Sequence, residues 1–507
     1  MQMETGADGP ASSSQVARKT RAGVVWTVGT GLVTRGIGLI TTLLLTGYMT
    51  PKEAGSVNVA LTLVTTVSVM TTVGLGQYVA SQRHPSARVA WNAMLLHVSL
   101  GLVAFTAALL LREPLARLSG APEAARFVPL LVLTFLLERV TFIPERVLVA
   151  HMRFRQLSIL RSAGELSYCA GALAVALLGH GPWCIVGGNL ARQLVRLALT
   201  LLYCRPGEWF VAEGARGDVI RALVRFGLPV MAASVAVFAT RRWDNLLVAS
   251  YYGTDVLGLY NLAYNLAEVP ATQIAEMVGE VLAPSFARLD PQERRRSAVD
   301  MVGGLALTVF PLAIGLGLVA PTLARLLPSR WEGMAPYLMG LSVLSLTRPA
   351  GMVLAVYLQA LRRPLPAAVL QMVQVVLLLG SLVCVGELLP DTPVAVCFAV
   401  GFTFTLGSLA AVYLLRVIDH VPAWPLLRVQ LVPTPALLCM ALCVRAVSLA
   451  SMRLGPLPPM AQLALEIVAG GLGYVGGALL LLPDTARRFL RSVRSLRAGT
   501  GGPSGRA

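Results

Sequence analysis

Long apolar segments separated by short polar connections run through most of the chain, and this pattern predicts membrane-spanning helices. A helix that crosses a bilayer needs about 20 mostly apolar residues. Fourteen segments meet that requirement, so the predicted fold class is an all-α integral membrane protein. Their approximate limits are 24–48, 56–80, 89–111, 127–150, 157–178, 182–203, 222–250, 256–283, 299–324, 335–360, 365–386, 393–415, 426–449 and 461–482.

Two stretches of the chain repeat each other at a constant offset, and both lie in apolar segments. Identical residues are Leu43, Leu44, Tyr48, Gly55, Asn58, Ala60, Gly76 and Ala80 in the first copy, and Leu246, Leu247, Tyr251, Gly258, Asn261, Ala263, Gly279 and Ala283 in the second. Six predicted helices separate equivalent positions, so both copies enter the membrane in the same direction. Parallel repeats of this kind are a common plan for transporters, with a site between the two halves.

This repeat divides the chain into five expected parts. They are a disordered cytoplasmic tail over 1–20, an N-lobe of helices 1–6 over 21–204, a C-lobe of helices 7–12 with its preceding loop over 205–420, two extra helices over 421–483, and a basic cytoplasmic tail over 484–507. Helices 13 and 14 have no partner in the repeat, so they form an appendage to the two six-helix lobes.

Composition supports the membrane assignment, and the charge gives an orientation. Hydrophobic residues make up 56% of the chain and charged residues 13%, against roughly 25% charged in soluble domains. The net charge of +17 does not require nucleic acid, because cytoplasmic loops of membrane proteins are enriched in Lys and Arg. Most cations lie in the even-numbered connections and the termini, which places both termini in the cytoplasm. The few on the opposite side include Lys52, Arg112, Arg117, Arg126, Arg325, Arg330 and Arg453.

Ionisable residues inside predicted spans are candidate site residues, because each is costly to bury in a membrane unless a cavity or partner receives it. The candidates for lining a substrate cavity are Arg35, Arg139, Arg241, Arg242, Asp244, Glu268 and Arg348. Arg241 and Asp244 are three residues apart, so they share a helix face and are expected to pair. Cations predominate, and guanidinium groups match phosphate, pyrophosphate and carboxylate. Structural ion pairing remains the alternative for each of these residues. Misplaced span limits are a further alternative for Arg35, Arg241, Arg242 and Asp244.

The sequence offers no hydrolytic or metal-binding constellation. No Walker loop, HExxH or GxSxG motif is present, and the five histidines are dispersed. The seven cysteines show no CxxC spacing, so neither a metal site nor a disulfide framework is indicated. Cys439 and Cys443 lie four residues apart on one helix face and are expected to serve packing. We therefore expect no metal and no cofactor, while proton or sodium coupling through the buried acids stays open.

Several ordered segments resemble polysaccharide flippases of the multidrug/oligosaccharidyl-lipid/polysaccharide exporter superfamily. The segments are Tyr48-Met49-Thr50-Pro51-Lys52-Glu53-Ala54-Gly55, Gly74-Leu75-Gly76, Arg225-Phe226-Gly227-Leu228-Pro229, Asp244-Asn245-Leu246-Leu247-Val248, Leu257-Gly258-Leu259-Tyr260 and Pro284-Ser285-Phe286-Ala287. The resemblance covers roughly residues 20–420. Asp244 matches an acidic position that recurs in the family pattern, whereas Arg35 matches no motif.

The resemblance implies a Wzx-type translocator of the bacterial inner (cytoplasmic) membrane with a cationic central cavity and alternating access. Its cargo would be an undecaprenyl-pyrophosphate-linked oligosaccharide for exopolysaccharide, capsule or O-antigen. Expected partners are this lipid-linked oligosaccharide, the bilayer, and the polysaccharide polymerase and export machinery, but no nucleic acid. The alternatives are a flippase for a peptidoglycan lipid precursor and a cation-coupled multidrug exporter. A membrane enzyme is disfavoured, since no connection is long enough to fold a catalytic domain.

Overall fold

The computed structural model describes residues 34, 36–82, 85–211, 213–286, 289–344, 346, 348–361, 363–455 and 457–483. All its regular elements in these ranges are helices, and nine of them are long and apolar enough to cross a membrane. The predicted all-α membrane class is therefore confirmed, while the total of fourteen spans stays a prediction. Of helix 1 of that prediction, residues 34 and 36–48 are described, whereas both predicted tails lie outside the described residues.

The chain divides into two compact units. Unit 1 consists of Met1–Met49 and Ser56–Arg242, and unit 2 of Thr50–Gly55 and Trp243–Ala507. The division falls at Trp243, inside the helix expected over 222–250, rather than at the expected lobe boundary between 204 and 205. The chain is not helical at Trp243 itself. Helix 7 of the prediction therefore contributes to both units, and the expected division of the chain into lobes stays a prediction.

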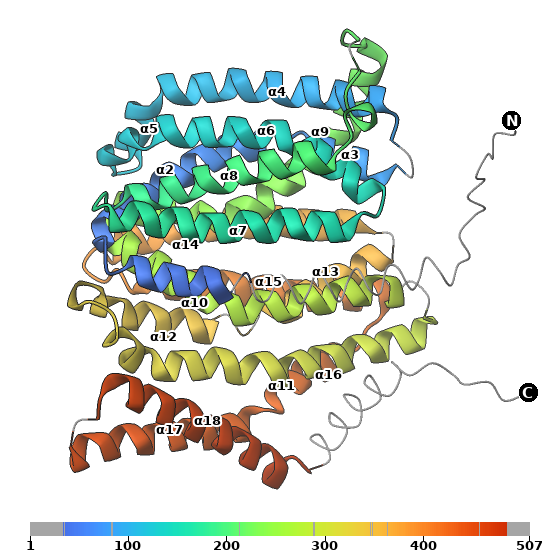
Figure 1. Ribbon diagram of the computed structural model, residues 1–507. Helices are drawn as coiled ribbons and strands as arrows, with labels where there is room; N and C mark the ends of the chain where they lie inside the picture. Colours follow the sequence, from blue (N-terminus) through green and yellow to red (C-terminus); the bar gives the residue numbers. More distant parts are fainter. Residues whose placement is uncertain are drawn as a thin grey trace, which may run out of the picture. The chain divides into compact units, whose positions relative to one another are not determined.

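Unit 1 is built from α-helices joined by short turns (Figure 1). They are α2 (Pro51–Met70, whose first residues belong to unit 2), α3 (Leu75–Ser81), α4 (Ala87–Leu110), α5 (Arg112–Leu118), α6 (Val128–Ala150), α7 (Phe154–Leu177), α8 (Trp183–Tyr203) and α9 (Gly217–Arg242), with 3-10 turns η1 (Pro122–Arg126) and η2 (Pro206–Glu208). A helix also covers Gly36–Leu45.

Small residues let α7 and α8 pack closely along their length (Figure 1). A methyl group at Gly171 would come within 2.6 Å of the Ala191 side chain, and one at Gly188 within 2.9 Å of the Tyr168 ring. Membrane helices associate largely through such close van der Waals contact, because lipid supplies no hydrophobic driving force between them. Helices 5 and 6 of the sequence prediction, which only a short connection separates, thus form a closely packed pair.

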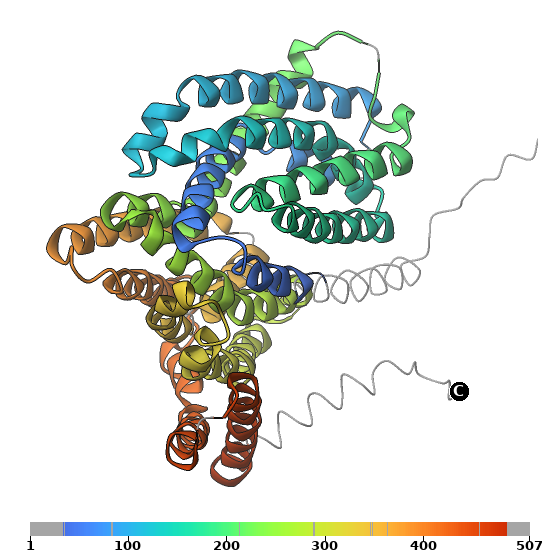
Figure 2. The same ribbon diagram turned by 60° about the vertical axis from the view of Figure 1, so that its left-hand side comes forward.

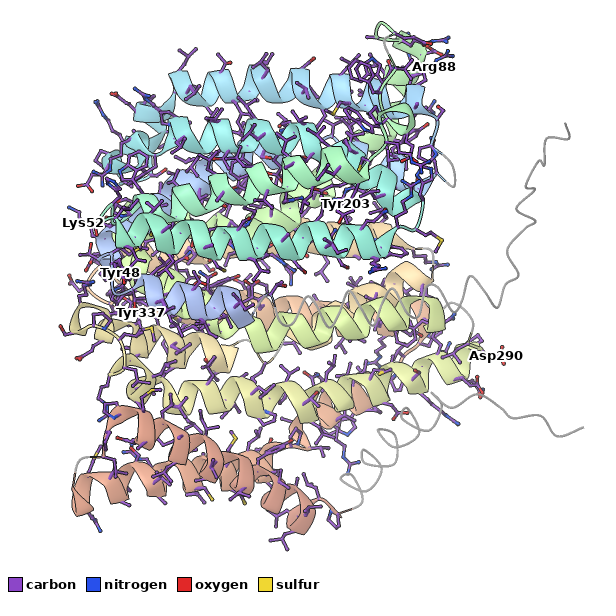
Figure 3. The ribbon with its side chains drawn as sticks, in the orientation of Figure 1. Tyr48, Lys52, Arg88, Tyr203, Asp290 and Tyr337 are labelled. Carbon is purple, nitrogen blue, oxygen red and sulfur yellow. The ribbon has the colours of Figure 1, made fainter. Side chains whose placement is uncertain are left out.

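The loop between α8 and α9 is fastened to unit 1 by polar contacts. Glu208 accepts two hydrogen bonds from Arg153, at 2.6 and 2.8 Å. Glu213 pairs with Arg88 at 2.8 Å, near the start of α4 (Figure 3). The Asn92 side chain accepts from the backbone N–H of Arg216 at 2.7 Å. These bonds hold the start of α9 against α4, which explains why α9 belongs to unit 1.

Unit 2 contains α10 (Asp244–Phe286), α11 (Pro291–Ala324), α12 (Ala335–Leu344), α13 (Arg348–Ala360), α14 (Pro364–Leu388), α15 (Ala395–Asp419), α16 (Ala423–Leu431), α17 (Thr434–Leu454), α18 (Pro459–Leu481) and the 3-10 turn η3 (Ser329–Met334). Lys52 and Tyr337 lie at one end of these helices and Asp290 at the other (Figure 3). This agrees with the predicted alternation, in which the Lys52 connection and the Asp290 connection face opposite sides of the membrane.

Helices α17 and α18, the predicted appendage, pack together as an antiparallel pair (Figure 2). Gly473 lies against the Cys443 side chain and Gly477 against that of Cys439, which confirms the packing role expected for these cysteines. The pair is tied to α11, since the Tyr474 hydroxyl donates to the Leu307 carbonyl oxygen at 2.7 Å.

A capping box starts α2 and gives the Tyr48–Gly55 motif a physical basis. The Glu53 carboxylate accepts from the Thr50 backbone N–H at 2.8 Å, and the Thr50 hydroxyl accepts from the Glu53 N–H at 3.3 Å. Pro51 occupies the first helical position, where its missing N–H costs nothing. The sequence Thr-Pro-Lys-Glu therefore specifies where this helix begins.

We expect Thr50→Ala to lower the free energy of unfolding by about 1 kcal/mol, the usual cost of losing an N-cap side chain. Thr50→Ser keeps the hydroxyl and should leave stability close to that of the parent protein. Thermal unfolding of the purified protein in one detergent measures both. Equal effects of alanine and serine would show that the cap hydroxyl contributes nothing.

Reciprocal glycine contacts join the start of α2 to α10 within unit 2. A methyl group at Gly55 would overlap the Thr254 carbonyl oxygen, and one at Gly258 would overlap the Pro51 carbonyl oxygen. Gly55 corresponds to Gly258 in the sequence repeat, and the same offset relates Pro51 to Thr254. The repeat thus has a symmetric structural counterpart, in which two backbones approach each other through equivalent glycines.

Candidate functional site

The chain reverses at Gly253, and this reversal creates a buried polar network in α10. Gly253 has φ 85° and ψ 169°, a backbone conformation that is essentially restricted to glycine. Residues 16 positions apart would be about 24 Å apart in an unbroken helix, yet Tyr260 donates a hydrogen bond to Asp244 at 2.7 Å. The predicted turn between helices 7 and 8 is therefore placed by this glycine.

The α10 network consists of Asp244, Asn245, Tyr260, Asn261 and Asn265. The Asn261 amide donates to the Asn245 side-chain oxygen at 3.2 Å, and the Asn265 amide donates to that of Asn261 at 2.9 Å. Asp244 is 2% exposed and Tyr260 fully buried. A carboxylate held in this way carries charge into the interior of unit 2, where electrostatic interactions are stronger than in water.

Asp244 is the predicted site residue whose surroundings the structure describes most fully, and its role in a site stays a prediction. Asp244→Asn keeps the shape but removes the charge and one hydrogen-bond acceptor, so we expect at least a tenfold loss of transport. That loss corresponds to about 1.4 kcal/mol, just below the range of about 1.5–3 kcal/mol for hydrogen bonds to charged groups. Substrate translocation by the variant, at equal membrane abundance, measures the effect.

The matched control for this prediction is Asp300→Asn. Asp300 lies in α11 and is exposed, so it removes the same charge from unit 2 without touching the α10 network. We expect this variant to transport normally. Normal transport by Asp244→Asn as well would remove Asp244 from the site.

A second polar cluster lies in unit 1, between α6, α7 and α8, and we call it the α6–α8 charge cluster. Glu145 accepts two hydrogen bonds from a single Arg196 nitrogen, at 2.7 and 2.8 Å, and Glu165 accepts from Arg192 at 2.9 Å. The Arg192 guanidinium lies 4.4 Å from the centre of the Tyr168 ring. These acids and cations compensate one another, which is how charged side chains become tolerable within a membrane helix bundle.

Arg139 is buried in unit 1, and its guanidinium N–H groups form hydrogen bonds with other protein groups. It is 1% exposed. Its guanidinium donates to the Ser68 carbonyl oxygen at 2.8 Å and to the Thr71 hydroxyl at 2.7 Å, and contacts the His97 ring at 3.1 Å. The Ser68 carbonyl lies in the last turn of α2, where it also accepts the Thr71 backbone N–H at 3.3 Å. This contact set favours a structural role for Arg139, as the alternative in the sequence analysis allowed.

The remaining predicted site residues are not brought together by any contact described in the structure. Arg241 is exposed and Arg242 is half-buried, both at the end of α9 in unit 1, whereas Asp244 begins α10 in unit 2. Glu268 is half-buried in α10. Arg35 and the Arg348 side chain lie outside the described residues. The predicted pairing of Arg241 with Asp244 stays a prediction.

The sequence analysis missed the amides and the tyrosine of the α10 network, because it searched only for ionisable groups. A usable signal was present, since Asn261 and Asn265 lie four residues apart on one face of an apolar helix. A buried amide is costly unless it is hydrogen-bonded, so two on one face predict a partner such as Asn245. Among the described residues, no group of three or more His, Cys, Asp or Glu side chains is arranged to hold a metal ion.

The helices and the two buried polar clusters define a multi-pass helical membrane protein. Solved structures share this fold. The lipid II flippase MurJ in an inward closed conformation superposes with a TM-score of 0.71 at 12% identity, covering 91% of this chain and 99% of MurJ. An inward-facing multidrug resistance MATE transporter gives a TM-score of 0.63 at 13% identity, covering 78% and 94%.

The family is identified by sequence, because a model described as "Polysaccharide biosynthesis protein" matches residues 44–336. The chain belongs to this family of polysaccharide biosynthesis proteins, which confirms the resemblance drawn from its motifs. The succinoglycan biosynthesis transport protein ExoT of Rhizobium meliloti is 29% identical over 65% of this chain and 66% of its own length. The lipopolysaccharide biosynthesis protein WzxC of Escherichia coli is 24% identical over 66% and 68%. The matched part thus spans about two thirds of these relatives.

Proposed function

We propose that the protein is a flippase for undecaprenyl-pyrophosphate-linked oligosaccharide repeat units in the synthesis of a surface polysaccharide. The supporting observation is the family match over residues 44–336, together with a relative named as a succinoglycan transport protein. The cargo moves from the inner to the outer leaflet of the bacterial inner membrane. No covalent bond changes, so the protein acts as a transporter and not as an enzyme.

The physical task is to carry a polar glycan and a pyrophosphate through hydrocarbon while the lipid tail remains in the bilayer. Two parallel lobes that open alternately to either side supply such a path. Arginines match the pyrophosphate, because a planar guanidinium can bind two phosphate oxygens at once. We assign this role to Arg35, Arg241, Arg242 and Arg348, with Asp244 and Glu268 as the acidic groups of the path.

The proposed orientation of the protein in the membrane rests on the unequal distribution of Lys and Arg between its connections, which puts both termini in the cytoplasm. The polysaccharide polymerase and export machinery are the proposed partners, because they use the translocated repeat unit. Asp244 and Glu268 are the candidate groups if transport is coupled to protons or sodium ions. Transport measured with and without each ion gradient tests that coupling.

A deletion strain tests the proposed function in cells. Lipid-linked oligosaccharide should accumulate on the cytoplasmic leaflet of the inner membrane, and one surface polymer should be lost. Plasmid-borne wild-type protein should restore both, and the Asp244→Asn variant should not. Unchanged leaflet distribution and unchanged surface polysaccharide, in a strain without a second flippase, would contradict the proposal.

An alternative function for a protein with this fold is that of a flippase for the peptidoglycan lipid precursor, since MurJ has the same fold. That function predicts lysis on depletion and normal surface polysaccharide. A cation-coupled drug exporter predicts drug hypersensitivity instead, and the excess of arginine at the candidate positions disfavours it because cationic drugs would be repelled. The deletion strain therefore distinguishes all three cargoes.

A further inference from the structure

Unit 1 contains a pocket of about 340 Å³ that is lined by three arginines. Arg112 and Arg117 come from α5, and Arg126 from the 3-10 turn η1. The volume lies at the lower end of the roughly 300–1,000 Å³ found for ligand pockets. Glu113 and Glu123 also line it, so the five ionisable groups together carry one net positive charge.

These arginines lie on the side of the membrane where cations are scarce. The pocket is formed where α4 ends and α6 is about to begin, opposite the arginine-rich connections at the other ends of these helices. The positive-inside rule depletes that side of Lys and Arg, and three of the few cations that remain there converge on one pocket. The positive-inside rule alone does not account for three arginines that line one pocket on that side.

Two of the three arginines make contacts that leave their guanidinium groups able to bind an anion. The Arg126 guanidinium lies 4.7 Å from the centre of the Phe127 ring, and this contact restricts its direction. Phe127 is itself fully buried and packs edge to face against Trp183, with ring centres 4.9 Å apart. Arg117 pairs with Glu113 at 3.5 Å, but both side chains are exposed, and an exposed pair contributes little and exchanges readily.

Apolar side chains beside the pocket face away from the protein. Leu110, Leu111 and Leu118 are 78%, 51% and 79% exposed, and they flank Arg112 and Arg117 in the sequence. At the end of a membrane span such leucines contact lipid chains, while arginines at the same level reach the headgroups. The pocket therefore offers arginines to a headgroup and leucines to the chains of the same lipid.

We propose that this pocket binds the phosphate of a lipid headgroup in the outer leaflet. Arg112, Arg117 and Arg126 bind the phosphate oxygens, and the leucines contact the acyl or polyprenyl chain. Two sources share this chemistry, an anionic phospholipid of the bilayer and the polyprenyl phosphate that carries the glycan. The site belongs to unit 1 alone, and of the two sources only the polyprenyl phosphate rests on the proposed function.

Lipid retention by the purified full-length protein tests this site. Native mass spectrometry would compare phosphatidylglycerol, undecaprenyl phosphate and, as a probe without phosphate, diacylglycerol. We expect the parent protein to retain at least one of the two phosphate lipids and no diacylglycerol. The Arg112→Ala/Arg117→Ala/Arg126→Ala variant should retain at least fivefold less. The phosphate lipid retained more strongly identifies the source.

The control variant Lys52→Ala/Arg330→Ala/Arg453→Ala removes the same charge from the same predicted side and should retain lipid normally. A further variant, Glu113→Gln/Glu123→Gln, leaves the arginines in place and should retain phosphate lipid more strongly. It tests the site even if the alanine variant folds poorly. Equal retention of diacylglycerol, equal loss in the control, or no gain in the glutamine variant would overturn the proposal.

Discussion

Gly258→Ala is expected to destabilise unit 2 by more than the usual cost of overpacking, which is about 1–3 kcal/mol. The added methyl group would overlap the Pro51 carbonyl oxygen, and a backbone atom cannot move aside as a flexible side chain can. Gly55→Ala should have a similar effect through the Thr254 carbonyl oxygen. Thermal unfolding of the purified variants in one detergent measures both.

The losses of stability caused by the two substitutions should not be additive, because both added methyl groups would push apart the same two backbone segments, the start of α2 and the part of α10 that it contacts. A displacement that makes room for a methyl group at Gly55 also separates Pro51 from Gly258, so the double variant should lose less stability than the sum of the single variants. Gly380→Ala in α14 is the control, since nothing lies within 4 Å of the added methyl group. If Gly258→Ala were as mild as this control, the crossing would not constrain the fold.

Glu145→Ala is expected to destabilise unit 1 by about 3–5 kcal/mol, because it leaves the Arg196 charge buried without its partner. The carboxylate and the guanidinium approach to 2.7 Å, and their side chains are only 9% and 19% exposed. Replacing both residues, as in Glu145→Gln/Arg196→Gln, removes both charges together. This double variant should be more stable than Glu145→Ala alone. Chemical or thermal unfolding of unit 1 in the full chain measures these differences.

The exposed pair of Arg88 and Glu213 is the matched control for Glu145. Its atoms approach to 2.8 Å, almost the same distance, but the side chains are 47% and 41% exposed. Water screens both charges, so Glu213→Ala should destabilise unit 1 far less than Glu145→Ala. Equal losses of stability at the two positions would mean that burial does not determine how much these ion pairs stabilise the protein.

Features encoded locally or by repetition could be predicted from the sequence. The apolar segments gave the helical membrane class, and Thr50 with Glu53 marks the start of α2 through side chains three residues apart. The offset that matches Gly55 to Gly258 also brings Pro51 to Thr254, and those residues form the backbone crossing. In each case the signal lies in residue type and spacing, which a single sequence contains.

Features that depend on tertiary contacts could not be predicted. Hydrogen bonds hold the loop before α9 to α4, and no spacing rule links Asn92 to Arg216. The burial of Arg139 depends on contacts with Ser68 of α2 and with Thr71 just after this helix, which are about 70 positions away in the chain. Charge in a helix identifies a residue that needs a partner, but it does not say whether protein or substrate supplies it.

Translocation by the purified protein in vesicles tests the central claim most directly. Undecaprenyl-pyrophosphate-linked oligosaccharide with a fluorescent glycan would be placed in both leaflets, and a quencher that cannot cross the membrane would be added outside. We predict that the protein makes the inner-leaflet glycan accessible to the quencher, and that Asp244→Asn slows this at least tenfold. Accessibility no greater than in protein-free vesicles, with the protein folded and correctly inserted, would contradict the assignment as a lipid-linked oligosaccharide flippase.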